Sequence, residues 1–164
     1  MKMTPPSLKV IIEITAIISL LTSLIIVIIE LSANERATRS ATASDVALSL
    51  SSWYTEVGLS GSGGEIFRNG MIDPESLTEN NRADFIYLLH GGMLLYQNAF
   101  VLGQEGTLDS SLQTVTLGTL SAIIDQPGFK LYWGQRELVF TRSFRDYIDQ
   151  LESLDSSGLT ELYN

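Results

Sequence analysis

Cysteine is absent from this chain, and histidine occurs only once, as His90. Without a thiol the protein has no disulfide, no thiolate nucleophile and no sulfur ligand for zinc or an iron–sulfur cluster. A single imidazole also excludes any site built from two histidines. We interpret His90 as a helix-surface or interface residue, and a general base or an axial ligand is the alternative.

Basic residues are also scarce. The chain has 10 Lys and Arg against 19 Asp and Glu, which gives a formal net charge of −9. A protein that binds a polyphosphate needs a cationic face, so we expect no nucleic-acid partner.

The usual catalytic motifs are missing as well. No serine lies in a Gly-x-Ser-x-Gly elbow, and the glycine-rich stretch 58–64 is followed by Glu65 and Ile66 instead of the Lys-Ser/Thr of a phosphate loop. Asp146, Asp149, Glu152 and Asp155 recur every three residues, which is typical of a solvated acidic helix face; a cation site is the alternative. We therefore expect no enzyme, no cofactor and no metal site.

What the chain does have is one long apolar run, residues 10–31, in which sixteen consecutive residues between Glu13 and Glu30 carry no charge. About 20 helical residues cross a bilayer core, so the run predicts an uncleaved transmembrane helix in contact with lipid. A cleaved signal peptide and a soluble core helix are the alternatives; the run is long for the first and apolar on every face, unlike the second. Small hydroxyl residues permit close helix packing in lipid, and the run offers three: Ser19, Thr22 and Ser23.

The residues that flank this run do not determine which end of the helix lies on the cytoplasmic side. Lys2 and Lys9 precede it, and Arg36 and Arg39 follow it, so the count of basic residues barely discriminates between the two sides. Glu13, four residues after Lys9, is interpreted as a carboxylate in the headgroup layer, with a proton or partner site in the membrane as the alternative.

The rest of the chain predicts an all-α fold, because apolar residues recur at helical spacing and no segment alternates with a period of two. We expect the transmembrane helix to continue into a small helical bundle domain, with a break near 32–34 as the alternative. The expected divisions are an N-terminal tail 1–9, the membrane helix 10–31, a helical extension 32–57, a helical domain 58–152 that begins with a Gly/Ser loop at 58–64, and a flexible tail 153–164.

Within the domain, the signals for helix boundaries are specific. Gly70 is expected to close a short helix as its left-handed cap, and Asp73 before Pro74 marks another start. A long helix is expected over 78–104, with Gly91 and Gly92 at a kink or a close helix crossing. Later helices should start at Asp109 and Thr141, and the inward positions of the first are expected to be Leu112, Val115, Leu120, Ile123 and Ile124.

Aromatic and basic residues gather near the C-terminal end of the domain. Trp, Tyr and Arg dominate protein–protein hot spots, so this group is one candidate interaction site. The alternative is that the rings form the core of the domain and that the arginines pair with Asp73, Glu75 or Asp84. The candidate interaction residues are Tyr132, Trp133, Arg136, Phe140 and Arg145.

Two blocks of sequence carry a resemblance. Residues 73–78 read DPESLT, and residues 127–145 contain Pro-Gly-Phe, Trp133, Arg136 and Phe144-Arg145. Together they resemble an uncharacterised family of bacterial single-pass membrane proteins with a compact helical domain, a resemblance that covers essentially the whole chain. It implies a fold and no activity. In such relatives the basic residues that follow the membrane helix favour a cytoplasmic domain.

These observations together favour a non-catalytic accessory or interaction subunit of a larger complex in the bacterial inner membrane, with integral membrane proteins as its partners. The alternative is a single-pass sensory or small-ligand-binding protein, which would require an internal pocket.

Overall fold

The computed structural model describes residues 7–151, which contain six α-helices and no strand. The predicted all-α fold is confirmed. The expected tail 153–164 lies outside the described residues. The chain divides between Arg39 and Ser40 into two units, each of which is described by itself.

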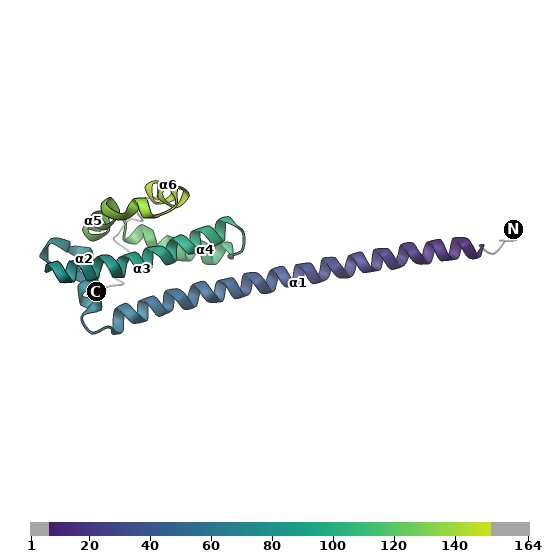
Figure 1. Ribbon diagram of the computed structural model, residues 1–164, viewed down its shortest axis with the longest axis horizontal. Coiled ribbons are helices and arrows are strands. Elements are labelled where there is room, and N and C mark those ends of the chain that lie inside the picture. The colour runs from purple at the N-terminus through teal and green to yellow at the C-terminus, as the bar shows by residue number, and fades with distance from the viewer. Residues whose placement is uncertain (1–6, 152–164) are drawn as a thin grey trace. The chain divides into compact units, whose positions relative to one another are not determined.

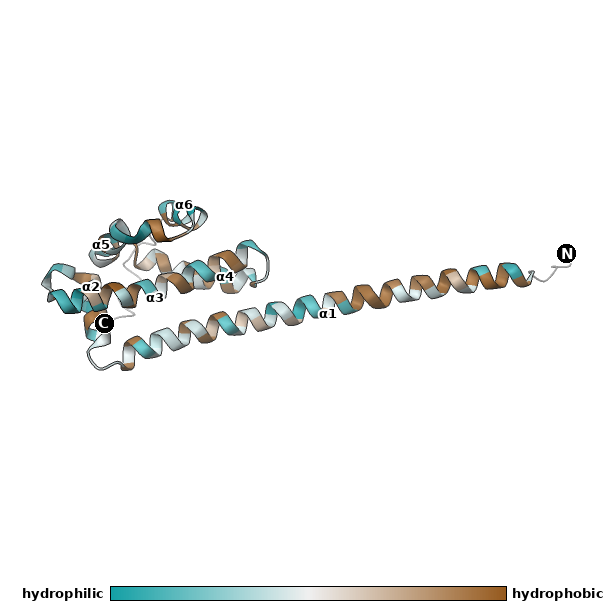
Figure 2. Cartoon of the chain, viewed as in Figure 1, coloured by the Kyte–Doolittle hydropathy of each residue, from teal (hydrophilic) through white to brown (hydrophobic). Residues whose placement is uncertain are grey.

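The first unit is the N-terminal part of α1 (Leu8–Leu59), an unbroken helix without the interruption considered near 32–34. Every described residue from 7 to 39 is exposed. The segment 10–31 is almost uniformly hydrophobic, whereas the residues that follow are mixed (Figure 2). None of this apolar surface is buried by residues 7–151, the part of the chain that the structure describes.

The second unit begins with the last turns of α1 and is organised around one central helix, α3, along which α2, α4 and α6 pack (Figure 1). Its elements after α1 are α2 (Gly63–Ile72), η1 (Pro74–Ser76), α3 (Glu79–Gln104), α4 (Ser110–Gly118), η2 (Thr119–Ala122), α5 (Pro127–Arg136), η3 (Glu137–Val139) and α6 (Arg142–Gln150).

Side-chain caps set three of the helix starts. Thr78 accepts a hydrogen bond from the backbone N–H of Asn81 at the start of α3, and Thr141 accepts one from Phe144 at the start of α6. Asp109 accepts from two backbone N–H groups at the start of α4. Each cap satisfies donors that the first helical turn leaves free, and the starts predicted at 78, 109 and 141 are confirmed.

The segment 58–78 differs from its prediction in two places. Only residues 60–62 separate α1 from α2, so the turn is shorter than the expected 58–64 loop. The prediction that Gly70 is a left-handed cap is wrong, because Gly70 lies inside α2. A Cβ atom there would overlap the ring of Phe85, so the glycine is needed for the approach of α2 to α3.

A close helix crossing explains Gly92, as the sequence suggested. A Cβ atom on Gly92 would lie 2.7 Å from Cζ2 of Trp53, on the C-terminal part of α1. The Trp53 indole N–H donates to the backbone oxygen of Leu88 at 3.0 Å, which fixes the ring against α3.

The prediction that Val115 in α4 points inward is wrong. Val115 is 69% exposed, and the buried residues on this helix are Thr116 and Leu117. The residue four positions after the partly buried Leu112 is Thr116, so the buried side of α4 runs through Thr116 and Leu117 and leaves Val115 exposed. Leu117 and Leu120 are three apart and both buried.

The contact of α5 with α2 generates a test of the fold. A Cβ atom on Gly128 would collide with backbone atoms of Gly70 and Met71, which cannot yield unless the helices separate. We expect Gly128→Ala to lower the free energy of unfolding by about 1–3 kcal/mol, as overpacking does. Denaturant unfolding of the full chain, followed by tryptophan fluorescence, measures this.

Gly134 is a matched control in the same helix, since a Cβ atom there meets nothing within 4 Å. Gly134→Ala should stabilise the domain by about 0.4–1 kcal/mol through the lower entropy of the unfolded chain. Equal effects of the two substitutions would show that the α2–α5 contact is not tight.

Candidate functional site

The hydroxyl side chains in the apolar part of α1 bond to their own helix. Thr22 donates to the backbone oxygen of Ile18 and Ser23 to that of Ser19, each at 2.9 Å. These protons therefore need no acceptor from outside, which lowers the cost of placing them in an apolar medium. Ser19, Thr22 and Ser23 are all exposed, and their role in helix packing stays a prediction.

Glu13 lies near the start of this segment, and its carboxylate is 3.8 Å from the Lys9 ammonium. Both side chains are more than half exposed. The pair is an ordinary exposed i,i+4 pair, which fits the interpretation of Glu13 as a headgroup-layer residue.

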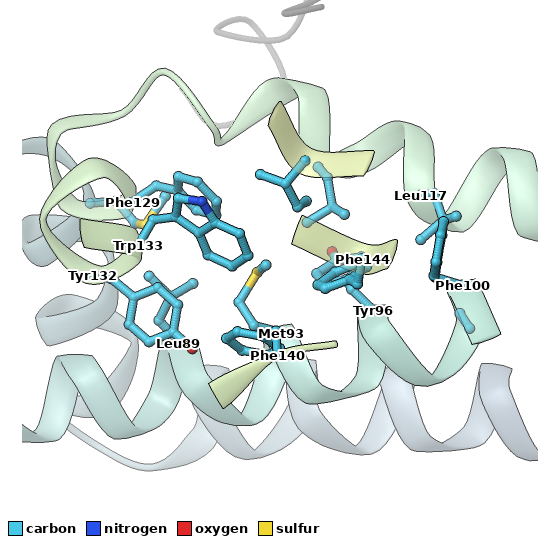
Figure 3. Close-up of a cluster of buried hydrophobic side chains, with 14 of the residues drawn as sticks. Leu89, Met93, Tyr96, Phe100, Leu117, Phe129, Tyr132, Trp133, Phe140 and Phe144 are labelled. Atoms are coloured by element: carbon cyan, nitrogen blue, oxygen red, sulfur yellow. The ribbon is translucent and has the colours of Figure 1, made fainter. Parts of the chain in front are cut away.

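The aromatic cluster is internal. Tyr132, Trp133 and Phe140 are all buried, and they pack with Phe129 and Phe144 over the centre of α3 (Figure 3). Trp133 stacks on Phe140 with ring centroids 5.3 Å apart. A partner cannot reach these rings while the domain is folded, so the alternative interpretation, that they form the core of the domain, describes them.

The arginines of the same group differ from the rings. Arg136 is exposed and Arg145 is half-buried. Neither forms an ion pair within residues 7–151, so the expected pairing with Asp73, Glu75 or Asp84 does not occur; Arg82 pairs with Glu75 instead, at 3.0 Å. Of the five candidate interaction residues, the two arginines are therefore the ones that reach the surface.

His90 has a structural partner. Its Nδ1 atom lies 2.7 Å from the hydroxyl of Tyr132, and the rings of Tyr132 and Phe140 lie beside it. Tyr132 is fully buried, so this bond satisfies a hydroxyl that would otherwise be desolvated without a partner. The pair joins α3 to α5 and gives His90 a place in the packing of the domain.

A second polar connection runs through two tyrosines. The Tyr54 and Tyr96 hydroxyls are 3.2 Å apart, and that of Tyr96 is 2.9 Å from Oγ1 of Thr119. Because Thr119 donates to the Thr116 backbone oxygen, Tyr96 donates to Thr119 and Tyr54 donates to Tyr96. Burial, together with the neighbouring Tyr96, raises the pKa of Tyr54 above its usual range, so it stays a neutral donor.

Two adjoining depressions mark the surface near the end of α1. One, with an open volume of about 480 Å³, lies among α1, α2 and α3, and its lining includes Trp53, Glu56, Asp84 and Tyr87. The other, of about 510 Å³, is lined by Ser52, Thr55, Glu56, Leu59 and Ser60. Glu56 and Ser60 belong to both, so the two form one continuous surface.

No signal in the sequence pointed to this surface. Trp53 was recognisable only as an apolar residue at helical spacing, and Glu56, Asp84 and Tyr87 belong to no motif. They come together because the turn at 60–62 reverses the chain and because α3 packs against the end of α1.

Within residues 7–151, no three His, Asp or Glu side chains are placed to hold a metal ion. No family model, curated protein or solved structure matches this chain. The resemblance to a family of single-pass proteins therefore stays a prediction, and the function has to be argued from the chain's own residues.

The His90–Tyr132 bond can be tested by a double-mutant cycle. Tyr132→Phe leaves Nδ1 of His90 without its partner, and His90→Leu leaves a buried hydroxyl unpaired, so each should cost about 1–3 kcal/mol of unfolding free energy. The double variant should cost less than the sum of the two, because the unpaired group is removed together with its partner.

Tyr87→Phe is the control, since Tyr87 is 71% exposed. Its effect should stay within about 0.5 kcal/mol. Strict additivity of the His90 and Tyr132 substitutions in denaturant unfolding would mean that the bond contributes nothing to stability.

Proposed function

We propose that this protein is a single-pass, membrane-anchored and non-catalytic accessory subunit that binds integral membrane proteins of a larger bacterial complex. The N-terminal part of α1 enters the bilayer, and the helical domain of residues 40–151 presents its surface to the partners.

The observation that carries the proposal is the uncovered apolar surface of α1. Both α1 and α3 are long and apolar enough to cross a membrane. In α1 none of the apolar window is buried by the described residues, and large side chains such as Leu20 (72%) and Ile29 (62%) are exposed. An aliphatic side chain in water costs about 1.5–3 kcal/mol relative to burial, so a helix with many of them requires an apolar surrounding.

The second apolar helix has a different explanation. The apolar face of α3 is already covered, because Phe85, Leu89, Met93, Tyr96 and Phe100 are buried among the other helices of the domain. Outside that face α3 carries Arg82 and Asp84, and placing these charged side chains in the hydrocarbon core of a bilayer would be energetically costly. A core helix therefore describes α3 better than a second span.

Two features support a binding role over chemistry or ligand sensing. His90 is engaged with Tyr132, so its imidazole has a structural use. The two depressions near the end of α1 are open to solvent, whereas a small-ligand sensor needs an enclosed site that removes most of the ligand from water.

The bacterial inner membrane and a cytoplasmic position for the domain follow from the family resemblance and belong to this proposal.

Protease added outside intact spheroplasts should therefore leave the domain uncut. Cleavage of the domain by that protease would mean that the domain lies on the outer side of the membrane.

The anchor is tested by placing a charge in the middle of the apolar run. Leu21→Arg should impair membrane insertion, because an arginine at a helix centre costs about 2.5–3.5 kcal/mol or more. We expect a substantial fraction of this variant to leave the membrane in an alkaline carbonate wash, while the unchanged chain stays.

Leu138→Arg is the matched control, since Leu138 is 79% exposed on the domain. This variant should stay in the membrane as the unchanged chain does. If Leu21→Arg were retained equally, the apolar part of α1 would not be the anchor.

The subunit role is tested by gentle detergent extraction and native purification on a tag attached to this chain. We expect a defined set of integral membrane proteins to co-purify in constant ratio across two detergents. A clean monomer with a bound small molecule would contradict the proposal and favour the sensory alternative.

A further inference from the structure

The depression among α1, α2 and α3, here called the acidic depression, has two carboxylates around its opening and no Lys, Arg or His among its lining residues. Glu56 comes from the end of α1 and Asp84 from the start of α3, and both side chains are exposed. Neither forms an ion pair within residues 7–151, in contrast to Glu75, which holds Arg82. The two negative charges are therefore available to a cation from outside.

Two aromatic residues share this lining. Trp53 is held by its bond to the Leu88 backbone oxygen and by edge-to-face contacts with Tyr54 and Phe67, at 4.9 and 5.5 Å between centroids. Tyr87 is 71% exposed. Aromatic rings attract cations, and the planar guanidinium of arginine both stacks on rings and pairs with carboxylates. Carboxylates and rings in one depression thus suit an arginine side chain best.

The adjoining depression adds an apolar requirement. Leu59 is 80% exposed there, beside Ser52 and Thr55, and it meets the acidic depression at Glu56. A free small cation would leave Leu59 in water. A polypeptide with an apolar side chain next to an arginine would cover both parts of the surface at once.

We propose that this surface, formed by Trp53, Glu56, Leu59, Asp84 and Tyr87, binds an arginine presented beside an apolar residue on a protein partner. The proposal deepens the accessory-subunit function and rests on it for the kind of partner. The net charge of −9 acts in the same direction, since it attracts a basic segment before contact. Charge complementarity of this kind contributes to the rate and the specificity of association.

The chain's two tryptophans permit a direct measurement. The full chain is labelled with fluorotryptophan, solubilised in detergent micelles and followed by fluorine NMR. It is titrated with the blocked peptide Ala-Leu-Arg-Ala and, separately, with Ala-Leu-Gln-Ala. We expect the arginine peptide to shift the Trp53 resonance with an affinity that weakens as salt rises, and the glutamine peptide to leave it in place. Trp133, in the core, is the internal reference.

The variant Glu56→Gln/Asp84→Asn tests the carboxylates while keeping the shape of the side chains. It should weaken binding of the arginine peptide by about tenfold. The control Glu105→Gln/Asp149→Asn removes the same charge from exposed positions outside the depressions and should change the affinity much less.

Three results would overturn the proposal: no Trp53 shift, equal shifts with both peptides, or equal weakening in the two double variants. These results are distinct from failure of the proposed function. The titration needs neither a bilayer nor the natural partner, whereas the carbonate wash and co-purification test those two points alone.

Discussion

Burial of the apolar face of α3 is the interaction on which the domain depends. Side chains from along this helix, among them Phe85, Leu89, Met93 and Phe100, are at most 5% exposed. Residues from α2, α4, α5 and α6 complete the same core. Because α3 supplies a contact surface to α2, α4 and α6, while α5 packs on α2, the positions of Gly70 and Gly92 follow from how closely α2 and α1 approach α3.

The same packing uses most of the residues that would otherwise suggest function. The aromatic rings near the C-terminal end are core side chains, and His90 supplies the partner of a buried tyrosine hydroxyl. A residue type that is common at active sites and interfaces is common in cores for related reasons, since rings bury a large area and carry one polar atom that needs a partner. The proposed function rests on two surfaces that the core leaves uncovered. One is the apolar part of α1, and the other is the pair of depressions at the C-terminal end of α1.

The two uncovered surfaces call for partners of different chemistry. The apolar part of α1 has its hydroxyls satisfied internally and matches an environment that offers no hydrogen bonds. The depressions combine carboxylates with the half-buried Trp53 and the exposed Tyr87 and Leu59, and the proposed occupant is a cationic and partly apolar segment. The proposed accessory role uses both surfaces, one for the bilayer and one for a protein partner.

The sequence by itself determined the helical class, the apolar run of α1 and the helix starts at 78, 109 and 141. These features depend on local spacing and on a side chain that caps its own helix, so neighbouring residues are enough to define them. Only the tertiary structure decided that Gly70 is a close-approach residue, that Leu117 and not Val115 is buried, and that Tyr132, Trp133 and Phe140 face inward. It alone brought Glu56, Asp84 and Tyr87 together. The physical reason is the same in each case: these properties belong to contacts between segments distant in the chain, and the spacing within one segment carries no information about them.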